Sequence, residues 1–224
     1  MNEENNRKGP GIFYAVVGVA TLVVAIIGAT FAYFSAQATA GGESITGSTN
    51  NDLAGALSVN VTRVNKTVTA ANSIDLVPAN IDGTLETVNN AVKAKCEANG
   101  YTGCHLYKIE AQSTQSVANA SILLSSLTVE STAKTNWAYA IYTGTETSAT
   151  NIVKTGSLNV TEPVDMHANA ALTANTPVTY YLIVYLKNVD SAQNAGDAAD
   201  ETGTYTGTVT MNAAGGKVSA TFSA

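Results

Sequence analysis

Residues 178–187 read VTYYLIVYLK, and this stretch decides the fold class. It joins β-branched and aromatic residues, with apolar side chains at both odd and even positions. That pattern is typical of a strand in the middle of a sheet, with both of its faces covered. The run that follows is rich in Asp, Asn and Gly, which favours a loop. We therefore expect a β domain built around this strand.

Segments with strand character lie on both sides of that stretch. Residues 56–64 alternate apolar and polar side chains, as a half-buried strand does. Further strands are expected at 73–77, 105–111, 122–130, 137–143, 152–158, 204–212 and 218–222. A turn at 213–216 joins the last two as a hairpin. Short strands separated by turn signals predict a mainly β fold, an antiparallel sandwich or jelly roll.

One short helix interrupts this β pattern. Leu85, Val88 and Val92 follow helical spacing, so a helix is expected over Thr84–Ala98. Either Asp82 or Thr84 can cap its start, because both side chains accept hydrogen bonds from free backbone N–H groups.

The N-terminal part has a different character. Residues 12–34 read IFYAVVGVATLVVAIIGATFAYF, and no charged residue occurs between Lys8 and Glu43. As a helix this run would be about 35 Å long, enough to cross the apolar core of a bilayer. The cations Arg7 and Lys8 before it favour a cytoplasmic N-terminus. We expect a hydrophobic helix for export or for anchoring in the membrane.

Small residues follow that run in two A-x-A arrangements that end at Ala38 and Ala40. These are the cleavage signals of a secretory peptide, and we expect cleavage after Ala38 or Ala40. The apolar run is longer than in most signal peptides, so a retained anchor stays open. The expected domains are residues 1–40 as signal peptide or membrane anchor, 41–55 as a flexible arm and 56–224 as the β-sandwich.

The charge balance limits the class of partner. From residue 41 onward nine cationic residues stand against fifteen acidic ones, with no basic stripe. Such a chain lacks the cations that neutralise nucleic-acid phosphates, so we expect no nucleic-acid partner.

Two cysteines, Cys96 and Cys104, lie close in the sequence. In an exported chain they favour a disulfide, which for so short a loop stabilises by about 2.5 kcal/mol. Two other states remain: free thiols, or a metal site that includes His105. The metal site lacks an evident fourth ligand, and its cysteines are further apart than in most zinc sites.

The sequence offers no set of catalytic residues. It lacks the H-E-x-x-H, G-x-S-x-G and phosphate-loop motifs. His167 lies in the segment DMHANA, where we expect a loop with a solvated histidine. The acidic stretch 190–201 could hold calcium, but its spacing does not match an EF-hand, and a solvated loop is the simpler interpretation. We expect no enzyme activity, no cofactor and no metal.

Three features resemble the TasA/camelysin group of bacterial surface and biofilm-matrix fibre proteins. They are the export segment GATFAYFSAQATA (28–40), the order of a strand ALSVNV and a long aromatic strand TYYLIVYLKN, and the closing GTYTGTVTMNAAGGKVSATF. The resemblance covers the first 60 and the last 45 residues and leaves the cysteine pair unmatched.

The resemblance implies a jelly-roll domain that polymerises outside the cell, as a secreted or cell-surface protein whose main partner is another copy of itself. In that case the arm at 41–57 would add as a strand to the sheet of a neighbour, with Ile45, Leu53 and Leu57 as anchors.

Two alternatives stay open. A type IV pilin-like subunit would also join an apolar helix to a β domain, but pilins of the common type have Glu where this chain has Val16. A membrane-anchored adhesive or binding domain would instead hold residues 12–34 in the bilayer.

Overall fold

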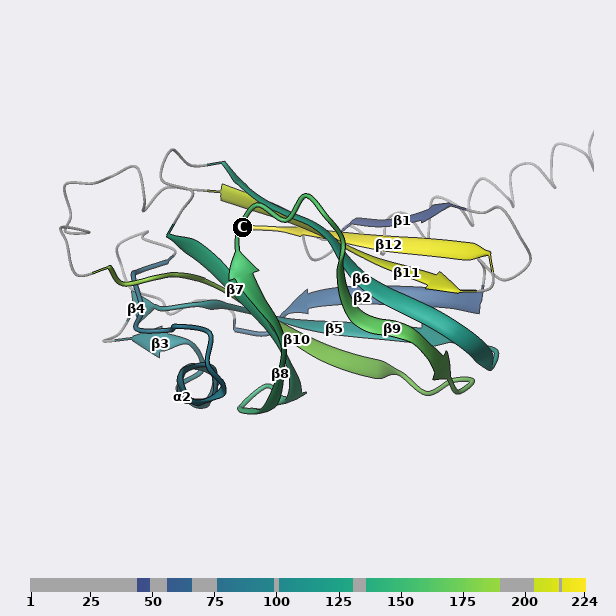
Figure 1. The fold of residues 1–224 in the computed structure, drawn as a ribbon, viewed down its shortest axis with the longest axis horizontal. Coiled ribbons are helices and arrows are strands. Elements are labelled where there is room, and N and C mark those ends of the chain that lie inside the picture. The colour runs from purple at the N-terminus through teal and green to yellow at the C-terminus, as the bar shows by residue number, and fades with distance from the viewer. Residues whose placement is uncertain are drawn as a thin grey trace, which may run out of the picture. The chain divides into compact units, whose positions relative to one another are not determined.

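The computed structural model describes residues 44–48, 56–65, 76–98, 101–130, 136–189, 204–213 and 215–224. Within these ranges the chain is mainly β, with two five-stranded antiparallel sheets and one short helix. The sheets face each other, and the helix lies on the outer side of one of them (Figure 1). The expected antiparallel β-sandwich is thereby confirmed.

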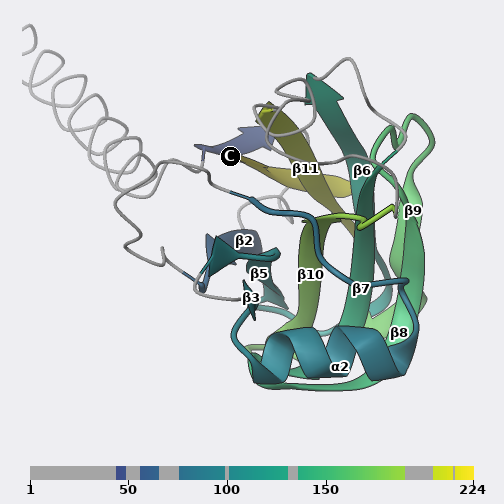
Figure 2. The same ribbon diagram turned by 90° about the vertical axis from the view of Figure 1, so that its left-hand side faces the viewer.

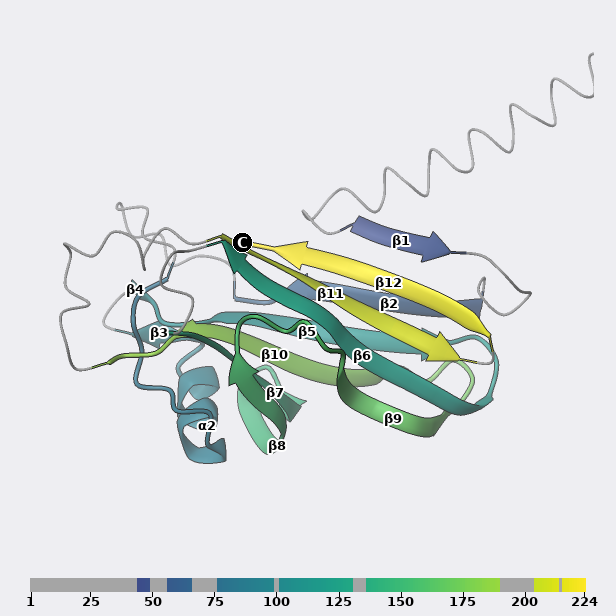
Figure 3. The same cartoon turned by 45° about the horizontal axis from the view of Figure 1, so that its top comes forward.

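Sheet A consists of five strands in the order β1-β12-β11-β6-β9. They are β1 (Ser44–Ser48), β12 (Gly216–Ser223), β11 (Thr204–Ala213), β6 (Val117–Glu130) and β9 (Val164–Leu172). The strands β11 and β12 form the hairpin expected at the end of the chain. β1 is the outermost strand beside β12 (Figure 3).

Sheet B consists of five strands in the order β2-β5-β10-β7-β8. They are β2 (Leu57–Arg63), β5 (His105–Ser113), β10 (Val178–Leu186), β7 (Trp137–Thr145) and β8 (Ser148–Ser157). The stretch that decided the fold class forms β10, which pairs with β5 on one side and β7 on the other. Its central position is confirmed.

Both faces of β10 are covered because each side of sheet B has its own apolar cluster. Tyr180, Leu182 and Val184 face sheet A in the main core. Ile183 and Tyr185 face the other way, into a second cluster beneath helix α2 (Leu85–Lys93). Apolar side chains on both faces of one strand are explained by these two layers.

Helix α2 ends at Lys93, so the expectation of a helix to Ala98 is wrong in its last residues. Lys95 and Cys96 adopt φ values of 54° and 61°, in the left-handed region that a right-handed helix cannot contain. At the other end Thr84 is the N-cap, and its hydroxyl accepts a hydrogen bond from the N–H of Thr87.

Two strands of sheet A were not expected. β1 lies within the segment 41–55, for which the sequence indicates a flexible arm. Residues 164–172, which include DMHANA, form β9 instead of a loop. The irregular pairing of β9 with β6, with register shifts at three places, explains why its residues do not alternate cleanly. The short strands β3 (Glu97–Ala98) and β4 (Tyr101–Thr102) pair with each other and were also not expected.

The strand expected at 73–77 is not found in its last two residues, because Leu76 and Val77 lie outside any strand. Its first three residues, 73–75, lie outside the described residues. In the described part of the chain no helix is long and apolar enough to cross a membrane. The apolar run at 12–34 lies outside that part, as does the acidic stretch 190–201.

Candidate functional site

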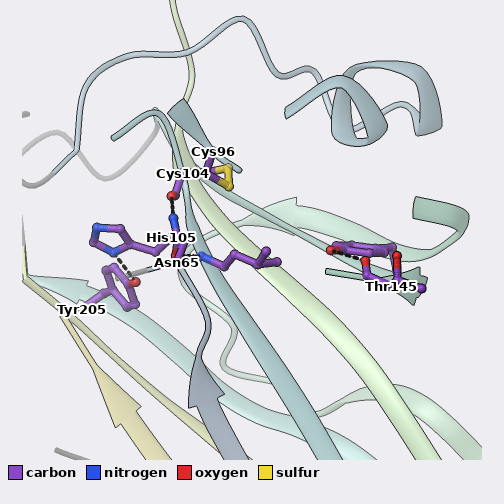
Figure 4. Close-up of a disulfide and its surroundings, with 8 residues drawn as sticks. Asn65, Cys96, Cys104, His105, Thr145 and Tyr205 are labelled. Atoms are coloured by element: carbon purple, nitrogen blue, oxygen red, sulfur yellow. Dashed lines mark hydrogen bonds between the residues drawn. A yellow bond between two sulfur atoms is a disulfide. The ribbon is translucent and has the colours of Figure 1, made fainter. Parts of the chain in front are cut away.

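The two cysteines form a disulfide at the end of α2. Cys96 bonds to Cys104 with a Cα–Cα distance of 4.9 Å, and both residues are buried. The bridge ties the turn after α2 to the start of β5 (Figure 4). The disulfide prediction is confirmed, and the two other states of these cysteines, free thiols and a metal site, are wrong for this structure.

His105 follows Cys104 and faces the main core instead of a metal. Its Nδ1 lies 2.6 Å from the hydroxyl of Tyr205 on β11 (Figure 4). That hydroxyl lies 2.7 Å from the hydroxyl of Tyr107, so one tyrosine joins two β5 side chains to sheet A. All three residues are at most 2% exposed. Hydrogen bonds in so buried a place connect the two sheets.

His167 lies on β9, so the expectation of a solvated loop histidine is wrong. Its Nδ1 lies 2.9 Å from the hydroxyl of Tyr180 on β10, which again connects the two sheets. Its Nε2 is buried without a hydrogen-bond partner in the described structure. Burial lowers the pKa of His167 below its ordinary value of 6.5, because the charged imidazolium would lose hydration.

Asn65 extends the pairing of β2 and β5 beyond the end of β2. Its side-chain amide donates to the carbonyl of Cys104 at 2.6 Å, and its oxygen accepts from the N–H of Leu106 at 2.7 Å (Figure 4). An asparagine can replace a strand residue in this way because its amide group has the donor and acceptor of a peptide. Asn65 therefore holds the start of β5, next to the disulfide.

A pocket lies beside the disulfide, between α2 and the segment before it. Its volume is about 210 Å³, and it is lined by Ala79, Ile81, Ala91, Ala94, Glu97 and both cysteines among others. Figure 2 shows α2 on the outer side of sheet B, close to β8. Glu97 is the one charged residue of this lining.

Among the described residues no group of acidic, histidine or cysteine side chains is arranged to hold a metal ion.

The residues of the expected assembly arm lie in different places. Ile45 is in β1, opposite Ala220 of β12. Leu57 is the first residue of β2, is 7% exposed and belongs to the main core of its own chain. Leu53 lies outside the described residues, as do Ala38 and Ala40. Among the described strands, β1 is therefore the one that lies wholly within the arm, and it is at the edge of sheet A.

The register of β1 covers its whole length. It pairs antiparallel with β12, from Ser44 opposite Thr221 to Ser48 opposite Lys217. Because β1 is the last strand of sheet A, its ladder connects it to one neighbour only among the described strands. A strand of five residues with a single partner is held by few hydrogen bonds.

Comparison with protein-family models and with curated protein sequences finds no match.

Proposed function

We propose that this chain is a structural protein of a bacterial surface or extracellular matrix, and that its copies assemble into fibres by exchanging β1. The observation that carries this proposal is the edge position of β1, a short strand that pairs with β12 alone among the described strands. An edge of this kind presents backbone groups to any strand of matching register.

We further propose that the sandwich is a variant of the jelly roll. The strands β5, β10, β7 and β8 of sheet B face β11, β6 and β9 of sheet A. This is the order in which a jelly roll distributes seven consecutive strands between its two sheets. The place beside β11, where the first strand of a jelly roll would lie, is taken by β12, and β1 extends the sheet from there.

Because all copies have the same sequence, β1 of one copy can pair with β12 of another. The strand β12 of a second copy offers β1 the same pairing that its own β12 offers. When each copy gives its strand to the next, the contact is head-to-tail and can continue into a filament. Leu57 sets the inner limit of the moving segment, because it is buried in the core of its own subunit.

Two further features agree with this proposal. The Cys96–Cys104 disulfide suits an oxidising compartment outside the cytoplasm. The sequence resembles the TasA/camelysin group in its export segment and its closing hairpin.

Removal of the arm tests the proposal. We expect the purified mature protein without residues 41–53 to keep its fold and to form no fibres in electron micrographs. The single change Ile45→Pro should act in the same direction, because proline lacks the N–H of a strand residue. Ile45→Val is the matched control and should assemble normally. Unimpaired fibres after the deletion would contradict the proposal.

The mature N-terminus separates this function from its alternatives. A start at Thr39 or Gly41 favours the secreted fibre subunit, and a start at Ile12 favours a pilin-like subunit. An intact Met1 favours an anchored adhesive domain. N-terminal sequencing of protein from the native membrane and medium makes this measurement.

A further inference from the structure

The turn that carries Cys96 has an uncommon backbone. Lys95 and Cys96 are consecutive residues with φ values of 54° and 61°. Both have a Cβ atom, which crowds the following carbonyl group in this region of backbone space. The disulfide to Cys104 and the hydrogen bond from the N–H of Cys96 to the carbonyl of Ala91, at 2.8 Å, hold the turn in this form. Opening the disulfide would remove the covalent constraint and leave the hydrogen bonds of the turn, which include that from the N–H of Lys95 to the carbonyl of Val92 at 2.9 Å.

The pocket beside α2 leads to this disulfide. Cys96 and Cys104 are 2% and 0% exposed as residues, yet both line the pocket. Its volume of about 210 Å³ is roughly ten times or more what one water molecule requires. Cys96 has the little exposure that remains, so a small thiol would approach the bridge through this pocket at Cys96 and not at Cys104.

The charged side chains of this turn are of both signs. Lys93 at the end of α2 and Lys95 in the turn are exposed cations, and Glu97 is the one acid of the same segment. Glu97 alone of these three lines the pocket, so access to the bridge is set by the shape of the pocket and not by charge.

We propose that Cys96–Cys104 is an exchange site for low-molecular-weight thiols, and that it opens while both sheets stay folded. A thiolate RS⁻ attacks the sulfur of Cys96, the S–S bond breaks, and Cys104 leaves as a thiolate. A second RS⁻ attacks the sulfur of the RS group, which releases RSSR and the thiolate of Cys96. Each thiolate takes a proton from water. Two electrons pass from two thiols to the protein disulfide.

The structure limits what such an exchange would change. The ribbon of β3 and β4 has two residue pairs, and the N–H of Gly103 donates to the carbonyl of Cys96 at 2.7 Å. These contacts lie within the loop that the disulfide closes. The pairing of β5 with β2 and β10 lies outside it. The released part is therefore the turn and the ribbon, while the main core keeps its packing.

The rate of reduction tests the proposal. The full chain, kept in detergent because of residues 12–34, is treated with cysteine at increasing concentration, and free thiols are alkylated and counted by mass spectrometry. We expect a rate proportional to the cysteine concentration, with an unchanged fluorescence spectrum of Trp137, the single tryptophan. A rate that levels off at the rate of global unfolding would overturn the proposal.

Filling the pocket tests the route. Ala91 lines the pocket, so Ala91→Leu should slow reduction by cysteine at least tenfold. Ala94→Leu offers a second test from an exposed position of the same lining. Ala168→Leu on β9 is the matched control, an exposed alanine away from the pocket, and should leave the rate unchanged. Equal rates in all variants that remain folded would overturn the assigned route.

A glycine substitution tests the part played by the backbone. Glycine accepts positive φ without crowding, so Lys95→Gly should shift the equilibrium with cysteine and cystine about three- to tenfold towards the disulfide. Asn175→Gly is the control, since Asn175 also has a positive φ, 57°, but lies between β9 and β10. It should leave this equilibrium unchanged. The same shift in both variants, or in neither, would overturn the assignment of strain to this turn.

Discussion

Gly207 shows how a single residue can determine the packing of a hairpin. It lies on β11 opposite Phe222 of β12. A Cβ atom at this position would lie 2.2 Å from the ring of Phe222, far inside van der Waals contact. Phe222 is 1% exposed and packs against Tyr107 of the other sheet, with ring centroids 4.7 Å apart. The ring therefore occupies the space that any other residue at 207 would need.

We expect Gly207→Ala to lower the free energy of unfolding by about 1–3 kcal/mol, because the added methyl group forces the Phe222 ring or the β11 backbone to move. Urea denaturation followed by Trp137 fluorescence measures the change. Thr206→Ala on the exposed neighbouring position of β11 is the control and should change stability by less than about 0.5 kcal/mol. Equal stability of the Gly207→Ala variant and the unchanged protein would contradict this account of the packing.

His167 should make the stability depend on pH. Burial lowers its pKa in the folded protein below the ordinary value of 6.5. Between these two pKa values the unfolded chain binds more protons than the folded one, so the free energy of unfolding falls as the pH falls below about 6.5. Besides Tyr180, the titratable or charged groups on the packed strands are Tyr181 and Tyr185 on β10, Asp165 on β9, Glu130 at the far end of β6 and Lys154 on β8.

The variant His167→Gln cannot take up this proton. Urea denaturation at pH 7.5 and pH 5 should show a larger loss of stability for the unchanged protein than for His167→Gln. The stability that the neutral imidazole of His167 contributes relative to its charged form is fully present above pH 6.5. It is lost as the pH falls through the lowered pKa of the folded protein. Parallel losses in the two proteins would contradict the burial of this imidazole.

At this scale the sequence predicts local pairs and misses distant ones. Cys96 and Cys104 are close along the chain, and their types alone indicate a bond. Tyr205 lies a hundred residues from His105, and nothing in the strand pattern indicates which tyrosine would reach a histidine. Such partners depend on how the two sheets are placed, which follows from the whole set of strands.

Helix α2 depends on a small network before its first turn. The carboxylate of Asp82 accepts hydrogen bonds from the hydroxyl of Thr87 at 2.6 Å and from the N–H and hydroxyl of Thr84. These bonds, with that from Thr87 contributing most, lower the pKa of Asp82 to about 2. Both candidates for the cap in the sequence thus take part, but Thr84 alone is the N-cap.

We expect Thr84→Ala to lower the free energy of unfolding by about 1 kcal/mol, since the N–H of Thr87 loses its side-chain acceptor. Thermal or urea unfolding measures the loss. Thr84→Ser keeps the hydroxyl and should recover most of the stability. If serine and alanine were equally destabilising at this position, the hydroxyl would not act as the cap.

The strand β9 is an element that the sequence pattern does not predict. Its sequence VDMHANAAL has three alanines, one asparagine and one aspartate, which are residues of low strand propensity. Its residues pair with β6 through several register shifts, so the burial of its side chains does not alternate. A regular edge strand would have shown a period of two. Tertiary packing on the main core, through Met166 and Leu172, forms β9 in spite of its composition.

For the whole molecule, the edges of the two sheets decide how copies can meet. β8 is one edge of sheet B, and there the N–H of Ala149 donates to Asn89 of α2 at 3.1 Å. β9 is one edge of sheet A, and its register shifts make it a poor template for another strand. β1 and β12 instead pair without a register shift over five residues. β2, the other edge of sheet B, also pairs without a register shift, over seven residues, but its Leu57, Val59 and Val61 are buried in the main core. The ladder of β1 is therefore the one best suited to exchange between copies.

A covalent lock between β1 and β12 provides the decisive test of that exchange. Thr46 and Ser219 are opposite in the register, and the Cα atoms of such pairs are about 4.5–5.5 Å apart, a range that suits a disulfide. We expect the oxidised double variant Thr46→Cys with Ser219→Cys to fold, to remain monomeric and to form no fibres. The strand it would give to a neighbour is bonded to its own subunit.

The single variant Thr46→Cys, alkylated after purification, controls for the loss of the threonine and should assemble like the unchanged protein. Light scattering and electron microscopy under the same conditions compare the two. If β1 stayed with its own β12 during assembly, the lock would make no difference, and normal fibres from the oxidised double variant would show this. Loss of fibres in the locked protein alone would mean that subunits join by moving β1, because the lock restrains that strand.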